Sequence, residues 1–157
     1  MRTTIVILLA TLLWSSPARA ECRASANAAY SVSVRLSPAA GRACLMIAEV
    51  FSGPDCRPEE SRWSETFGCN VTDRMAVTDQ GNLVSLLAPA TAHRDWSIVA
   101  VISWRDDRVV EKWLSLDEIP GTEALHGVVR PVFDGAAVRF AEDVAIGFAA
   151  LESLAPA

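Results

Sequence analysis

The sequence predicts a mainly β protein, in the form of an antiparallel β-meander, sandwich or small barrel with one short helical turn and two disulfides. Three observations lead to this fold class. Short apolar segments recur along residues 30–151, with turn residues between them. No long segment has the 3.6-residue apolar period of a helix. The chain contains four cysteines, an even number that suits disulfide pairing in an oxidising compartment.

The first twenty residues have the layout of a cleavable secretory signal peptide. A positive charge at Arg2 precedes an apolar run of ten residues, and Ala18-Arg19-Ala20 places small residues where signal peptidase reads them. A membrane-spanning helix needs about 20 apolar residues, so this run is too short for an anchor. Glu21 precedes Cys22 where a lipid-modified cysteine needs a small residue. We therefore expect cleavage after Ala20 and a secreted or periplasmic protein without a membrane span.

The chain is acidic, with 14 Lys and Arg against 19 Asp and Glu among its 157 residues and a formal net charge of −5. Cleavage would remove Arg2 and Arg19 and leave 137 residues with a net charge of −7, a length that suits one domain over residues 21–157. A surface with this negative net charge repels nucleic acid and anionic membranes, so neither is an expected partner.

Residues 30–36, YSVSVRL, carry the clearest strand pattern, because apolar and polar residues alternate with a period of two. Residues 37–41, SPAAG, predict a turn, and the apolar run 43–51 predicts a returning strand, although its first part also suits a helix. Residues 52–60 predict a loop that contains Cys56. Residues 61–70 have little pattern, and a disulfide at Cys69 would tie them to the core.

Two further hairpins are predicted in the middle of the chain. Asp79-Gln80-Gly81-Asn82 separates two apolar runs, as in a tight turn whose glycine takes a positive φ. Residues 96–104, WSIVAVISW, are apolar on both faces, which indicates a central strand. The chain then turns at Asp106-Asp107 and returns over residues 108–114.

The C-terminal part begins with one predicted helical turn over residues 115–119, capped by Ser115 or Asp117. The last predicted hairpin joins residues 136–141 to 144–151 through Glu142-Asp143, and the tail from Glu152 is expected to fray. The sum is seven or eight short strands with brief connections, the pattern of an antiparallel meander, sandwich or small barrel.

Residues 75–116 resemble one blade of a β-propeller. The likeness lies in VTDQGNLV, WSIVAVI and VVEKWLSL, which follow the order strand, D-x-G turn, strand and outer hairpin. The segment is also similar to parts of small exported bacterial β-meander proteins of unassigned function. A complete propeller needs about 4–8 blades, and the chain contains one such segment. The resemblance therefore implies a four-stranded meander and no particular activity.

The four cysteines are Cys22, Cys44, Cys56 and Cys69. They allow three pairings, and we favour Cys22–Cys44 with Cys56–Cys69 because both loops are then short. A zinc site is the alternative, but the spacing lacks the close C-x-x-C pairs of structural zinc ligands. We expect no metal and no cofactor.

No catalytic motif is recognised, since the chain has two histidines and no G-x-S-x-G nucleophile elbow. His93 lies in the predicted loop 88–95, where a solvated side chain is the simpler interpretation and a binding role is the alternative. His126 allows the same two interpretations. The three acidic pairs, at 59–60, 106–107 and 142–143, are neighbours in predicted turns, as is typical of solvated charge.

Four tryptophans follow the signal segment. We expect Trp96 and Trp104 in the core, because their strand is apolar on both faces. Trp104 and Trp113 would face each other or lie diagonally across the hairpin that turns at Asp106-Asp107. Trp63 and Trp113 have polar neighbours and, together with His93, are the candidates for surface binding.

The sequence favours an exported, non-enzymatic binding or structural module whose partner is a protein or another component of the cell envelope. One alternative is a secreted inhibitor of a basic hydrolase such as a lysozyme, because opposite charge would speed their association. A second alternative is a hydrolase with an unrecognised site that uses His93 or His126.

Overall fold

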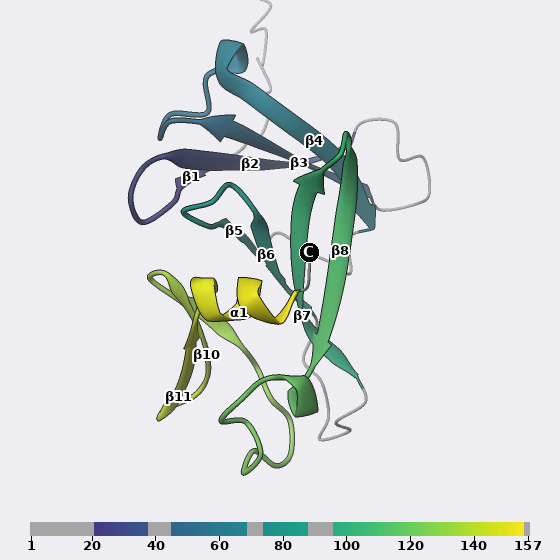
Figure 1. Cartoon of the computed structure of the whole chain (residues 1–157), viewed down its shortest axis with the longest axis vertical. Helices are drawn as coiled ribbons and strands as arrows, with labels where there is room; N and C mark the ends of the chain where they lie inside the picture. The colour runs from purple at the N-terminus through teal and green to yellow at the C-terminus, as the bar shows by residue number, and fades with distance from the viewer. Residues whose placement is uncertain (1–20, 38–44, 69–73, 88–95, 156–157) are drawn as a thin grey trace, which may run out of the picture.

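The computed structural model of the protein describes residues 21–37, 45–68, 74–87 and 96–155. These residues form eleven strands and one α-helix, and the strands pair antiparallel in three sheets (Figure 1). The prediction of a mainly antiparallel β fold is confirmed, and within the described residues all three sheets are open. Residues 1–20, the predicted signal peptide, lie outside the described residues. No helix in the described part is long and apolar enough to cross a bilayer.

The N-terminal sheet consists of β1 (Glu21–Ala24), β2 (Tyr30–Leu36), β3 (Leu45–Ser52) and β4 (Ser61–Gly68), in that spatial order. The β2–β3 pairing confirms the first predicted hairpin, with Tyr30 opposite Ser52 and Leu36 opposite Met46. The segment that follows residue 60 is a strand with one irregularity in its pairing with β3, and the sequence pattern does not predict it. Its two large apolar residues, Trp63 and Phe67, are both buried beneath the sheet.

The middle sheet is a meander of β5 (Met75–Val77), β6 (Leu83–Leu86), β7 (Ser97–Arg105) and β8 (Arg108–Ser115). Both predicted turns are present. Asp106 and Asp107 connect β7 to β8 with φ values of 49° and 59°, and two positive φ angles are the mark of a two-residue type I′ turn. The resemblance to a propeller blade stays a prediction.

The C-terminal elements are β9 (Val132–Asp134), β10 (Ala137–Ala141), β11 (Val144–Gly147) and α1 (Phe148–Leu154). The turn between β10 and β11 lies at Glu142-Asp143, as predicted. The extension of the last strand to residue 151 is wrong, because the chain becomes helical at Phe148. Residues 148–154, FAALESL, are mostly strong helix formers, and Phe148 and Leu151 bury one face of the helix.

The described residues also contain two short 3₁₀ turns, at Pro58–Glu60 and Leu116–Glu118. The second is the predicted helical turn, and Ser115 is its cap. The backbone N–H of Ser115 donates to the carboxylate of Glu118 at 2.9 Å, and Lys112 Nζ donates to the same carboxylate at 2.7 Å. These contacts hold the pKa of Glu118 well below its ordinary value, at about 2, with the Lys112 hydrogen bond as the largest cause.

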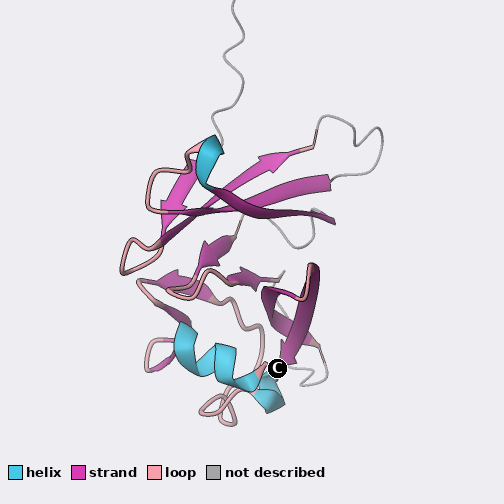
Figure 2. Cartoon of the chain, turned by 45° about the horizontal axis from the view of Figure 1, so that its top comes forward, coloured by secondary structure: helices cyan, strands magenta, loops and turns pink. Residues whose placement is uncertain are grey.

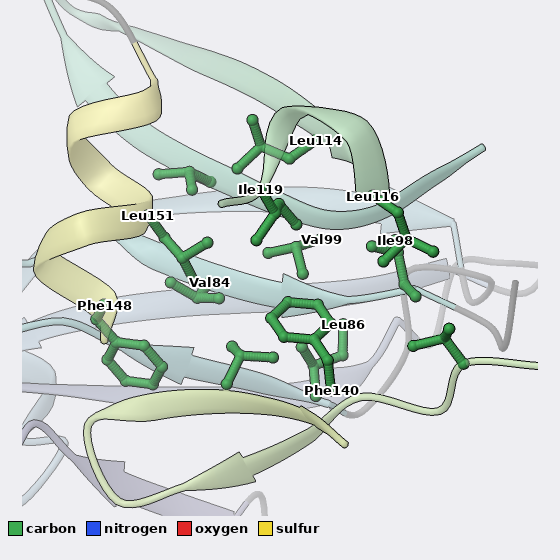
Figure 3. Close-up of a cluster of buried hydrophobic side chains, with 13 residues drawn as sticks. Val84, Leu86, Ile98, Val99, Leu114, Leu116, Ile119, Phe140, Phe148 and Leu151 are labelled. Carbon is green, nitrogen blue, oxygen red and sulfur yellow. The ribbon is translucent and has the colours of Figure 1, made fainter. Parts of the chain in front are cut away.

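The middle sheet lies between the N-terminal sheet and the C-terminal elements (Figures 1 and 2). It therefore contributes to two apolar clusters. The N-terminal core, between the two four-stranded sheets, contains Val32, Ala48, Val50, Trp63, Phe67, Met75, Val77, Leu83, Leu87, Ala100 and Ile102. The C-terminal core, under α1, contains Val84, Leu86, Ile98, Val99, Val101, Leu114, Leu116, Ile119, Val129, Val138, Phe140, Phe148 and Leu151 (Figure 3). This arrangement explains why β7 is apolar on both faces.

The structure contains a disulfide between Cys22 and Cys56, so the favoured pairing of Cys22 with Cys44 and Cys56 with Cys69 is wrong. Cys22 lies on β1 opposite Ser33 of β2, and the backbone N–H of Cys56 donates to Ser31 Oγ at 3.1 Å. The loop after β3 thus folds over β2 and brings the two Cα atoms to 5.9 Å. Cys44 and Cys69 lie outside the described residues.

Candidate functional site

A groove opens where the start of β4, the β5–β6 turn and the tip of the β7–β8 hairpin meet. Its volume is about 360 Å³, within the range of small-ligand sites. We name it the tryptophan groove and define it by its lining residues, Tyr30, Ser61, Arg62, Trp63, Gln80, Gly81, Asn82 and Trp104. They come from four segments that are far apart in the sequence, so the groove exists only in the folded chain.

Two stacked tryptophans form the aromatic part of the groove. The ring centroids of Trp63 and Trp104 are 6.2 Å apart, with 15° between their planes. Trp63 is 7% exposed and Trp104 is 41% exposed, so the buried ring supports the open one. Offset stacking of this kind holds the outer ring in one orientation.

The expectation that Trp96 and Trp104 belong to the core is wrong, since they are 58% and 41% exposed. Strand β6 pairs with β7 only from Val99 to Ile102, and the hairpin tip that carries Trp104 projects beyond it. Trp96 precedes β7 at its other end. The alternation along the strand is also interrupted by a bulge near Ile98, which turns Ile98 into the C-terminal core while Ile102 faces the N-terminal core.

The β5–β6 turn forms a second wall of the groove. Gly81 has a φ of +78°, and a Cβ at this position would lie 2.9 Å from Cε1 of Tyr30. The turn is closed by the Thr78 N–H, which donates to the Asn82 carbonyl at 2.8 Å, and by the Gly81 N–H, which donates to the Thr78 carbonyl at 3.1 Å. Glycine is therefore required here by both its φ and its contact with the Tyr30 ring.

The C-terminal helix holds this turn in place from behind. Thr78 Oγ1 donates to Glu152 Oε1 at 2.5 Å, and Asn82 Nδ2 donates to the same oxygen at 2.7 Å. Because a carboxylate only accepts, the Asn82 amide turns its NH₂ group toward Glu152 and keeps its carbonyl oxygen on the other side. Glu152 begins the tail that the sequence predicts to fray, and in the structure it is an anchor of the groove wall.

Arg62 is the charged residue among those that line the groove, and none of the ion pairs found among the described residues involves it. Three carboxylates lie just outside the lining, and each accepts a hydrogen bond from a neighbour. Ser61 Oγ donates to Glu49 at 2.6 Å, the Asn27 N–H donates to Asp79 at 2.9 Å, and Glu152 accepts from the turn. The groove therefore carries one open guanidinium within an acidic neighbourhood.

Of the three residues selected for surface binding, one lines the groove. Trp63 contributes its buried ring, as described above. Trp113 is 41% exposed, and its Nε1 donates to Glu111 at 2.9 Å. It lies opposite Ala100, whereas Trp104 lies opposite Val109, so the two tryptophans are separated by about 13 Å along the hairpin and do not face each other. His93 lies outside the described residues.

Other candidate chemistry does not gather at one place. His126 is exposed in the connection before β9, and the acidic pairs 59–60, 106–107 and 142–143 lie in separate turns. Within the described ranges, no cluster of three or more His, Cys, Asp or Glu side chains is arranged to hold a metal ion. The tryptophan groove, by contrast, brings aromatic, amide and guanidinium groups together, and it is therefore the candidate site.

Sequence reasoning missed Tyr30, Arg62, Gln80, Asn82 and Trp104 as site residues. The sequence predicts the hairpin at the D-x-G turn, and Gly81 has the positive φ that this prediction requires. Nothing in the sequence indicates that this turn would lie against Tyr30 or beside the stacked tryptophans.

Comparison with known proteins finds no match, since no family model, no curated protein and no solved structure is significantly similar to this chain.

Proposed function

We propose that this protein is an exported, non-enzymatic binding module and that the tryptophan groove is its ligand-binding site. The observation that carries the proposal is the supported aromatic face of Trp104, which is surrounded by polar side chains in one groove of about 360 Å³. An exposed tryptophan on a rigid support gives contact area with little loss of conformational entropy on binding.

The chemistry of the lining favours binding over catalysis. A nucleophilic mechanism needs a nucleophile with a base in hydrogen-bond reach. The lining residues contain no histidine, cysteine or carboxylate. The Ser61 hydroxyl donates to Glu49, but this carboxylate lies outside the lining, and no third group found among the described residues orients it as a base. What the groove offers is an aromatic face, two amides, a phenol and a guanidinium, which are recognition groups.

Export is part of the proposal and rests on the signal-like segment at residues 1–20 together with the Cys22–Cys56 disulfide. We also propose that all four cysteines are oxidised in the exported protein, as their even number favours in an exported chain. Mass spectrometry of the exported protein should show a chain that starts at Glu21 and no free thiols. An intact Met1 with four free thiols would contradict the export proposal.

The binding proposal is tested with polysaccharide, peptide and lipid fractions of a cell-envelope extract, added to the ¹⁵N-labelled protein. At least one fraction should shift the indole N–H signal of Trp104 in the NMR spectrum. The Trp104→Ala variant should no longer retain that fraction. Trp113→Ala is the matched control, because this residue is also 41% exposed and lies outside the groove. Equal loss in both variants, or no retention by the unaltered protein, would contradict the proposal.

A further inference from the structure

We infer that the ligand of the tryptophan groove is a neutral glycan, with one sugar ring stacked on the open face of Trp104. This inference rests on the proposed binding function and adds its ligand class. A pyranose ring has a flat face of C–H groups and a rim of hydroxyl groups. The groove contains groups that suit both features, the exposed indole of Trp104 and a set of polar side chains, within one short site.

The aromatic side chains of the groove are held in place by packing within the protein itself. Trp104 is stacked on Trp63 at 6.2 Å, and Trp63 is itself packed in the N-terminal core with Val50 and Ile102. The Tyr30 ring is held by its contact with Gly81. Side chains fixed in this way lose little freedom on binding, which favours recognition of a weakly apolar ligand such as a sugar.

The polar rim matches hydroxyl groups, which both donate and accept hydrogen bonds. Arg62 supplies donors only, and its guanidinium is planar. Gln80 supplies a donor and an acceptor, and the Tyr30 hydroxyl does the same. The Asn82 amide donates to Glu152 on one side, which leaves its carbonyl oxygen as the acceptor that it can offer to a ligand. A proline-rich peptide offers carbonyl acceptors but few donors, so it would leave the Asn82 carbonyl oxygen without a partner.

Charge selects a neutral glycan over an acidic one. A single carboxylate on the ligand would gain the contact with Arg62, but it would enter a neighbourhood that contains Glu49, which accepts from Ser61, and Glu152, which accepts from Asn82. The chain as a whole carries a formal net charge of −5, so an acidic polysaccharide would also be repelled over the Debye length of about 10 Å. A neutral glycan meets neither of these repulsions.

The test uses isothermal titration calorimetry of the full exported chain with cellotetraose, chitotetraose, xylotetraose and maltotetraose. At least one of these probes should bind, and its affinity should fall by about tenfold or more in Trp104→Ala, because the aromatic contact is lost. Trp104→Phe should recover part of the affinity, and Trp113→Ala should leave it unchanged. Circular dichroism confirms that each variant is folded.

Tetragalacturonate and a proline-rich decapeptide serve as competing probes. The inference is overturned if no neutral probe gives Trp104-dependent binding, or if either competitor binds more tightly than every neutral probe. The extract experiment separates this failure from failure of the proposed function. A Trp104-dependent fraction that contains no glycan would keep the binding module and remove the glycan.

Discussion

Gly81 lies where the β5–β6 turn meets the aromatic ring of Tyr30. Its position combines a positive φ with a contact that leaves no room for a side chain. Gly127 has nearly the same φ, +80°, and nothing lies within 4 Å of an added Cβ. A comparison of the same substitution at the two glycines therefore separates the energetic effect of backbone strain from that of the contact with Tyr30.

We predict that Gly81→Ala lowers the free energy of unfolding more than Gly127→Ala does. Both substitutions place alanine at a positive φ, which costs about 1–2 kcal/mol. Gly81→Ala must also displace the Tyr30 ring, and overpacking of this kind costs about 1–3 kcal/mol more. Urea unfolding of both variants measures the difference. Equal losses would show that the Tyr30 contact has no energetic weight.

Glu118 provides a second test at the residue scale. Its pKa in the folded chain is about 2, whereas its ordinary value is 4.5, and Lys112 and Ser115 are the cause. A depressed pKa stabilises the folded state above the unfolded pKa, and this contribution is lost as the pH falls from about 4.5 to 2. The Glu118 side chain is 39% exposed, so solvent screening reduces the effect.

We predict that Glu118→Gln has a lower melting temperature than the unaltered protein at pH 7 and that the difference narrows between pH 4.5 and pH 2. Thermal melting at several pH values measures it. Glu142→Gln is the control, because Glu142 lies in the exposed β10–β11 turn. A difference that stays constant across this pH range would mean that the ionised Glu118 carboxylate does not stabilise the fold.

At the scale of elements, α1 is joined to a distant turn. Its residue Glu152 accepts hydrogen bonds from Thr78 and Asn82, which stand at the two ends of the β5–β6 turn. Thr78 is 1% exposed, so its hydroxyl would lose its acceptor in a place that water does not readily reach. The helix thereby stabilises a wall of the groove that it does not line.

We predict that Glu152→Ala destabilises the protein by about 1–3 kcal/mol, because the buried Thr78 hydroxyl loses its acceptor. Glu152→Gln, which keeps an acceptor oxygen, should lose less. Ser153→Ala is the matched control on the same helix, since Ser153 is exposed and its hydroxyl donates to the Ala150 carbonyl within the helix. Urea unfolding ranks the three variants, and a Glu152→Ala loss no larger than that of Ser153→Ala would refute the anchoring role.

The apolar pattern of strand β7 extends over a buried part of the hairpin β7–β8 and over an exposed part. Over Val99–Ile102 the strand is flanked by β6 and buried on both faces, as its apolar pattern predicts. Beyond Ile102 it projects past its neighbour, and Trp104 becomes a surface residue. The pattern alone could not locate this change, because it depends on how far the partner strand extends.

The whole molecule is organised around the middle sheet, which supplies residues to both cores. Leu83 and Leu86 lie three positions apart on β6, and they belong to the N-terminal and the C-terminal core respectively. Loss of either core would uncover one face of the same sheet. We therefore expect the three layers to unfold together.

We predict that Leu83→Ala and Leu86→Ala each lower the free energy of unfolding by about 2–5 kcal/mol, the usual cost of a core cavity. Leu36→Ala is the control, because Leu36 is 67% exposed. This substitution should change the free energy of unfolding by no more than about 0.5 kcal/mol. Far-UV circular dichroism and tryptophan fluorescence should report a single transition in urea. Two separate transitions, with each core variant shifting only one of them, would show independent units.

The sequence by itself determined the features that depend on near neighbours along the chain. These are the alternation of residues 30–36, the turns at 79–82, 106–107 and 142–143, and the capped turn at 115–119. Each is decided by local φ preference, side-chain alternation or a cap within a few residues. Local patterns therefore sufficed for the antiparallel β class and for most strands of the middle sheet.

Tertiary structure alone decided the Cys22–Cys56 pairing, the helix at residues 148–154 and the tryptophan groove. Loop length is a weak guide to disulfide pairing, because each doubling of a loop costs only about 0.6 kcal/mol. The apolar run 144–151 suits a strand or a helix until its partners are known. The groove combines Tyr30, Trp63, Gly81 and Trp104, whose approach follows from the packing of two sheets rather than from any segment's own pattern.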